Sequence, residues 1–134
     1  MMGLPPSAVS HGLDLDDASG AAGCGAGVEW IRRTLTDMGL LDHGGDVVLV
    51  GAELLSNAVK HGGGARHLAL DRHDRFLRIG VSDHDPHPPR MAEHRPDSIG
   101  GHGLFLIDQL ALRWGTRPAP GGKTVWADLP LPPP

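Results

Sequence analysis

Three polar side chains near the middle of the chain have the spacing to act together in chemistry. Glu53, Asn57 and Lys60 stand at positions i, i+4 and i+7, which places them on one face of an α-helix. A carboxamide oxygen can ligate a hard cation such as Mg²⁺. A lysine can meet phosphate, and a carboxylate can take a proton from an attacking hydroxyl. Together they would suit ATP chemistry if the rest of the chain supplies a nucleotide pocket.

Hydrophobic periodicity predicts the helix that carries this face. Apolar residues recur at helical spacing over about 46–61, and a run of glycines at 62–64 is a typical helix end. A similar pattern with a stop at Gly39 predicts an earlier helix over 26–38. Residues 1–25, rich in Gly, Pro, Ser and Ala, indicate a flexible arm with a short strand near 13–15. The domain should therefore span 26–130, followed by a disordered or extended tail at 131–134.

The second half of the chain reads mainly as strands. Alternating apolar residues predict a hairpin over 68–70 and 76–81, a short helix over 103–110, and final strands over 111–116 and 124–129. Prolines after Val81 end the second strand, so 86–101 should form a long loop, and loops of this length are usually functional. This order predicts an α+β two-layer sandwich: one mixed, mostly antiparallel sheet covered on one face by about three helices.

Composition narrows the class of protein. The length of 134 residues suits one domain, and the net charge of -4 argues against a general nucleic-acid binder. Cys24 is the only cysteine, which fits a reducing cytoplasmic setting. Neither a signal peptide nor an apolar run of membrane-spanning length is visible, so no membrane contact is expected. The nine histidines lack a standard metal spacing, and dispersed solvent-facing histidines are a commoner explanation than a metal site in the long loop.

Four segments then occur in the order of a known ATP-binding fold. The chain resembles the domain shared by DNA gyrase, the Hsp90 chaperones, histidine kinases and MutL, and within it the small anti-sigma factor serine kinases of Gram-positive bacteria. The matching segments are the asparagine box at 53–61, the first glycine box at 81–86, the second at 100–104 and the last at 122–125. The resemblance covers about 26–129, and the ordered set is far more specific than any single box.

The resemblance implies roles for the helical face. Asn57 would ligate Mg²⁺ bridging the phosphates, and Glu53 would act as general base on the incoming hydroxyl. The alternative for Glu53 is an exposed carboxylate that pairs with Asn57 or Lys60. Lys60 would reach phosphate, although an ordinary surface lysine is an equally good reading.

Similar proteins use the carboxylate at the position of Asp83 to accept a hydrogen bond from the adenine amino group. An acceptor suits an amino group and repels the carbonyl of guanine. Thr124 would assist at the base through its hydroxyl or a water. The alternatives are a strand-ending aspartate that caps a turn and a plain β-branched strand residue.

The second glycine box would bind the phosphates. Gly101 and Gly103 precede the third helix, where backbone N–H groups can approach phosphate. The alternative is that these glycines only make the end of the loop flexible. His102 and Leu104 complete this box and are assigned with it to the nucleotide site.

Two departures from the family pattern concern the same site. Asp85 and His87 stand where the first glycine box normally has glycines. His102 stands where many relatives of this subtype carry arginine, and a mostly neutral histidine stabilises transferring phosphate less well. The first change would alter how the adenine pocket closes, and the second bears on catalysis more than on binding.

The resemblance therefore implies a protein serine/threonine kinase that uses ATP and Mg²⁺. Its expected substrate is a small anti-anti-sigma (STAS-type) protein, and it would also sequester a sigma factor, often as a homodimer. The alternative is a nucleotide-binding, partner-sequestering regulatory module with little or no kinase activity.

Overall fold

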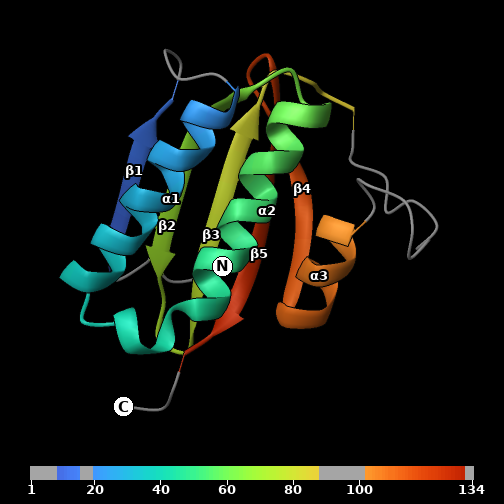
Figure 1. Ribbon diagram of the computed structural model, residues 1–134. Coiled ribbons are helices and arrows are strands. Elements are labelled where there is room, and N and C mark those ends of the chain that lie inside the picture. The colour runs from blue at the N-terminus through green and yellow to red at the C-terminus, as the bar shows by residue number, and fades with distance from the viewer. Residues whose placement is uncertain (1–8, 16–19, 88–101, 132–134) are drawn as a thin grey trace.

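The computed structural model describes residues 9–15, 20–87 and 102–131, and shows one five-stranded sheet (Figure 1). The strand order is β1-β2-β3-β5-β4, and every neighbouring pair is antiparallel. The strands are β1 (Val9–Asp14), β2 (Ala65–Arg72), β3 (Phe76–Asp83), β4 (Arg113–Ala119) and β5 (Gly122–Pro130).

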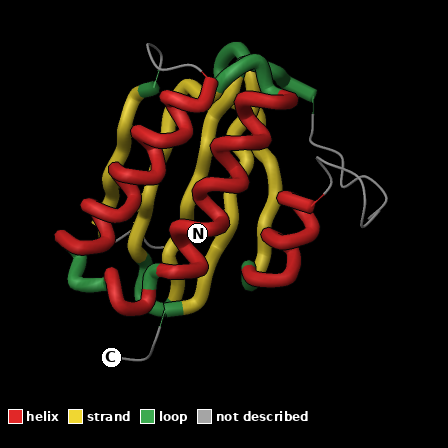
Figure 2. Tube along the Cα trace, viewed as in Figure 1, coloured by secondary structure: helices red, strands yellow, loops and turns green. Residues whose placement is uncertain are grey.

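The helices lie together on one face of this sheet (Figure 2). They are α1 (Gly20–Asp37), the short 3₁₀ turn η1 (Leu41–His43), α2 (Gly45–His61) and α3 (His102–Leu110). Aliphatic side chains from α2, such as Val50 and Leu54, meet Leu68, Ile79 and other inward residues of the sheet. The predicted α+β sandwich is confirmed, with the sheet antiparallel throughout.

Helix α2 and the hairpin that follows it agree closely with the sequence. The backbone N–H groups of Gly62 and Gly64 both donate to the carbonyl of Ala58, which ends the helix. Gly63 and Gly64 have φ values of 73° and 115°, which favour glycine over other residues. This turn returns the chain into β2, so the end of α2 is held beside the sheet.

The N-terminal part of the chain differs from the prediction. Residues 9–14 pair with β2 as an edge strand, and α1 begins at Gly20 rather than near residue 26. Glycine and alanine give little periodic signal, and packing supplies what propensity does not. A Cβ on Gly27 would lie 2.6 Å from a Leu55 methyl group, so this glycine lets α1 approach α2 closely. Much of the expected arm is therefore part of the sandwich.

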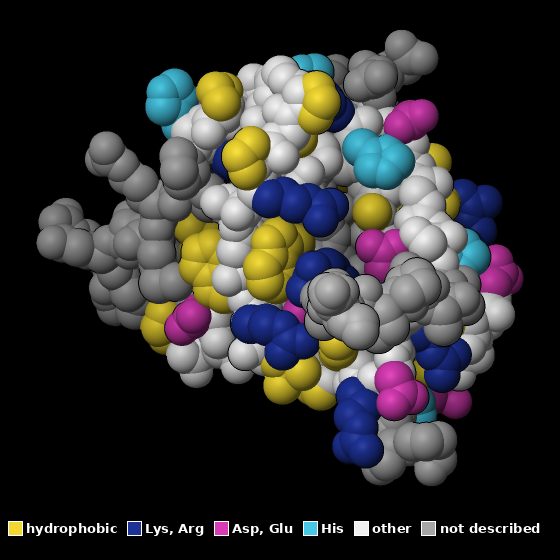
Figure 3. Space-filling view, turned by 180° about the vertical axis from the view of Figure 1, so that it is seen from behind, with side chains coloured by type: hydrophobic (Ala, Val, Ile, Leu, Met, Phe, Trp, Pro, Cys, Tyr) yellow, Lys and Arg dark blue, Asp and Glu magenta, His cyan; other side chains and the backbone are white. Residues whose placement is uncertain are grey.

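The opposite face of the sheet has no helix over it in the described part of the chain. It carries arginine and hydrophobic side chains together (Figure 3). The Arg78 guanidinium lies 4.2 Å from the Trp126 ring and forms two hydrogen bonds, of 2.6 and 2.8 Å, with the Asp128 carboxylate. Arg113 adds an ion pair of 2.6 Å to the same carboxylate, which is fully buried. These contacts join β3, β4 and β5 across the back of the sheet.

Two predicted features fall outside the described residues. Positions 88–101 include most of the long loop and Gly101 of the second glycine box. Within the described ranges, no helix combines the length and the hydropathy needed to cross a bilayer.

Candidate nucleotide site

The site predicted from the sequence centres on the meeting point of α2, β3 and β5. The backbone N–H of His84, just after β3, donates to the carbonyl of Gly62 at 2.9 Å. A Cβ on Gly62 would overlap the Asp83 carboxylate, and one on Gly122 would overlap the Asp83 carbonyl. Two glycines from other elements thus let the backbone close tightly around Asp83.

The Asp83 carboxylate is almost fully buried and bonded on both oxygens. It is 2% exposed; Oδ1 accepts the backbone N–H of Asp85 at 2.9 Å, and Oδ2 lies 2.8 Å from Nζ of Lys123. The Lys123 ammonium also donates to the carbonyl of Asp85 at 2.9 Å. The first contact is the turn-capping role considered for Asp83, and the second is an ion pair that the sequence did not indicate.

Thr124 lies away from this carboxylate. Its hydroxyl is 2.7 Å from Ser82 Oγ, and the two residues are direct partners in the β3–β5 register. Side chains alternate along a strand, so Asp83 and Lys123 share the face opposite to Ser82 and Thr124. The structure therefore brings Lys123, and not Thr124, to Asp83. Alternation with Val125, Ala127 and Leu129 already places Lys123 on the core face of the sheet, and the pairing of β5 with β3 brings it beside Asp83.

Glu53 and Asn57 occupy successive turns of α2 and are both half-buried. The Asn57 Nδ2 atom is buried and has no hydrogen-bond partner among the described residues. A buried amide without a partner is costly. Because nitrogen and oxygen of an amide exchange on a flip, either atom can occupy this position. A buried amide without a partner among the described residues fits a side chain that binds a ligand, and its oxygen suits Mg²⁺.

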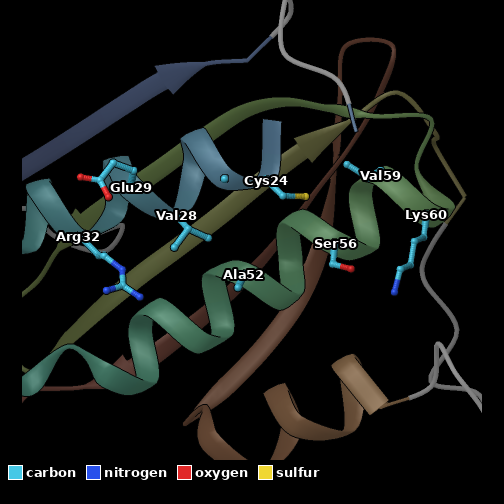
Figure 4. A pocket seen from close by; sticks show the side chains of 9 residues that line it. Cys24, Val28, Glu29, Arg32, Ala52, Ser56, Val59 and Lys60 are labelled. Carbon is cyan, nitrogen blue, oxygen red and sulfur yellow. The ribbon is translucent and has the colours of Figure 1, made fainter. Parts of the chain in front are cut away.

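Lys60 is exposed and borders a different feature from Glu53 and Asn57. It lines a pocket of about 640 Å³ between α1 and α2. Figure 4 shows the lining side chains of both helices, with Cys24 and Arg32 on α1 and Ser56 and Lys60 on α2. Burial raises the pKa of the Cys24 thiol, and the positive charge of Lys60 opposes that rise. The phosphate contact of Lys60 stays a prediction.

The start of α3 carries the remaining predicted residues. His102 and Gly103 stand in its first turn. Leu104 is buried in the hydrophobic core together with Ile107. The structure thus gives Leu104 a packing role, and the nucleotide contacts of this box stay a prediction.

Metal ligation by clustered side chains finds no support in the described ranges, which contain no group of three or more His, Cys, Asp or Glu placed around one point. Asp85 and His87 bond each other instead, with Nδ1 of His87 2.7 Å from Oδ1 of Asp85. Hydrogen bonds from the His87 backbone and ring hold the pKa of Asp85 below its ordinary value. The residues that replace the expected glycines therefore form a small local turn.

Comparison with known proteins agrees with this arrangement. The family model described as a histidine kinase-like ATPase domain matches residues 18–129, which is most of the chain and includes every element that forms the site. No curated protein matches the chain. The antiparallel sheet with helices on one face, the asparagine helix and the buried aspartate after β3 all lie within the matched region. The chain belongs to the histidine kinase-like ATPase domain family.

Proposed function

We propose that this protein is a cytoplasmic, ATP-dependent serine/threonine kinase of the anti-sigma type. It would phosphorylate a small anti-anti-sigma (STAS-type) protein and sequester a sigma factor, as a homodimer. The main support is the buried amide of Asn57, which has no hydrogen-bond partner in the described ranges and lies one helical turn from Glu53, on the helix whose end lies against Asp83. This helix carries a carboxylate and a buried amide, and its end lies beside an aspartate that could accept a hydrogen bond from adenine. Such an arrangement suits nucleotide chemistry.

Asp83 would bind the adenine end of the nucleotide. Its carboxylate would accept a hydrogen bond from the amino group of adenine, which guanine lacks at that position. The backbone N–H of Asp85 and the Lys123 ammonium hold the carboxylate in place without a ligand, and Gly62 packs against it. Binding would then require little reorganisation of the protein at this end.

Residues of α2 would bind and act on the phosphates. Asn57 would hold a Mg²⁺ ion, which supplies positive charge to the transferring phosphoryl group. Glu53 would take the proton of the attacking serine hydroxyl. Gly101 and Gly103 would contribute backbone N–H groups to the phosphates.

Titration with ATP, with and without Mg²⁺, tests the binding part of this proposal. Wild type should bind Mg-ATP, Asp83→Asn should weaken binding at both Mg²⁺ conditions, and Asn57→Ala should remove mainly the Mg²⁺-dependent part. Asp74→Asn, in the exposed β2–β3 turn, and Ser56→Ala, next to Asn57 on α2, are matched controls. Unaltered ATP affinity in both site variants would remove the assignment.

The transfer step needs a separate measurement. Incubation with labelled ATP and a purified STAS-type protein should label a serine, and Glu53→Gln should lose transfer while it still binds ATP. The second candidate is a nucleotide-binding, partner-sequestering module without transfer. The histidine at position 102 and the altered first glycine box favour that candidate. ATP binding by wild type, together with the absence of labelling on every serine substrate tried, would select it.

A further inference from the structure

We propose that Lys123 is a base-recognition residue of the nucleotide site, and that it donates a hydrogen bond to N1 of adenine while Asp83 accepts one from the 6-amino group. This inference rests on the proposed binding of ATP and adds a second specificity-determining side chain to it. The starting observation is the contact of 2.8 Å between the Lys123 ammonium and the Asp83 carboxylate.

Both groups keep unused hydrogen-bonding capacity. An ammonium has three N–H donors, and the described contacts of Lys123 use two of them, on Asp83 Oδ2 and on the Asp85 carbonyl. A carboxylate has roughly four acceptor positions, and Asp83 uses one on each oxygen. Counting the contacts of the described residues, one donor of Lys123 and at least one acceptor position of Asp83 remain unused, on two groups that lie 2.8 Å apart.

An adjacent donor and acceptor match the edge of a 6-aminopurine. Adenine presents an amino donor next to the N1 acceptor, so one carboxylate and one ammonium can satisfy both at once. Guanine presents a carbonyl and an N–H in the reverse order, and in the same pose it would set its carbonyl against Asp83 and its N1–H against Lys123. A site that hydrogen-bonds both positions rejects such a mismatch strongly, because its buried polar groups are left unpaired.

A purely structural role explains the pair less well. Asp83 and Lys123 are 2% and 5% exposed, and burying two charges costs solvation that their attraction only partly returns. A well-packed apolar pair would stabilise these strands equally or better. An ion pair with spare donor and acceptor positions beside the α2 terminus is better suited to recognising a polar ligand. The test must therefore measure nucleotide binding and not the stability of the fold.

The experiment compares ATP with 1-deaza-ATP, in which N1 of the base is replaced by C–H. Wild type should bind the analogue about tenfold more weakly than ATP, the loss typical of a hydrogen bond to a charged donor. Lys123→Met keeps an unbranched side chain of nearly the same length but removes its donors, so it should bind both nucleotides weakly and with equal affinity. Arg117→Met, an exposed cation on β4, should keep the wild-type ratio.

Each outcome decides one statement. Equal affinity of wild type for ATP and 1-deaza-ATP would overturn the role of Lys123 and leave ATP binding intact, and this result needs no variant that folds. Tighter ATP binding by Lys123→Met, or GTP binding as strong as ATP binding, would also overturn it. Failure of wild type to bind ATP would overturn the proposed function itself, and the base contact with it.

Discussion

Gly62, at the end of α2, lies directly against the carboxylate of Asp83, at the end of β3. The φ of Gly62 is -111°, which any residue can adopt, so the backbone does not require glycine there. The neighbouring Asp83 carboxylate requires glycine, because it leaves no room for a Cβ at this position. This contact links the helix of the asparagine box to the carboxylate that is predicted to bind the adenine amino group.

Gly62→Ala should therefore disturb the site at its base end. The added methyl group must displace either the Asp83 carboxylate or the end of α2, and such overpacking costs about 1–3 kcal/mol of stability. Urea unfolding should show this loss, and titration should show weaker ATP binding. Gly45→Ala, in the first turn of the same helix, meets no atom within 4 Å and should change neither property. Equal behaviour of the two variants would contradict the contact.

Asn57→Ala should make the protein more stable while it impairs function. The substitution removes a buried amide nitrogen that has no described partner and replaces a modest helix former with the best one. The free energy of unfolding should rise by about 1 kcal/mol, and ATP binding should lose its dependence on Mg²⁺. Ser56→Ala is the control for the helix. A loss of stability in Asn57→Ala would mean that the amide has a structural partner.

Asp128→Asn should destabilise the fold without acting on the site. The fully buried carboxylate receives two hydrogen bonds from Arg78 and an ion pair from Arg113. Loss of these charge-assisted contacts should lower the free energy of unfolding by about 2 kcal/mol. ATP affinity, measured well below the unfolding temperature, should match wild type. A normal urea midpoint would show that the cluster on the back of the sheet contributes little.

Asp85 should titrate at unusually low pH. Hydrogen bonds from the His87 backbone and ring lower its pKa below the ordinary 3.8. A folded-state pKa below the unfolded one means that this stabilisation is complete above the unfolded pKa and is lost as pH falls through the folded one. NMR of the Asp85 carboxyl carbon should give a midpoint below 3.8, and His87→Ala should move it partly back. A midpoint equal to that of an unstructured peptide would contradict the turn.

The sequence predicts the elements whose signals are local. Helix α2 has a periodic apolar face and a glycine stop, and it is confirmed nearly to the residue. The β2–β3 hairpin is confirmed as an element, but β2 extends beyond the predicted 68–70 on both sides and β3 ends two residues later than predicted. The start of α1 and strand β1 depend on contacts with α2 and β2, which lie far away in the chain. Neither carries a strong signal of its own, because glycine-rich segments take their conformation from their neighbours.

The same distinction between local signals and long-range contacts applies to the candidate site. Helical spacing singles out Asn57, and the family resemblance singles out Asp83 at the end of a strand. The alternation of β5 places Lys123 on the same face as Asp83, but their contact depends on how β5 pairs with β3, which only the structure shows. A shift of one residue in that pairing would exchange the side chains of Lys123 and Thr124.

The inward residues of β5 also limit how the site can evolve. Val125, Ala127 and Leu129 alternate into the core, so sliding the strand by one position would carry all three to the outside. An insertion or deletion at the tight β4–β5 turn, where Gly121 has a φ of 74°, is thus a poor route to new base selectivity. Point substitution at position 123 keeps that alternation but removes the partner of the buried Asp83 carboxylate. If Lys123 contacts the base as proposed, changes of nucleotide preference should therefore come from joint substitutions at positions 83 and 123, while the length of the turn stays constant.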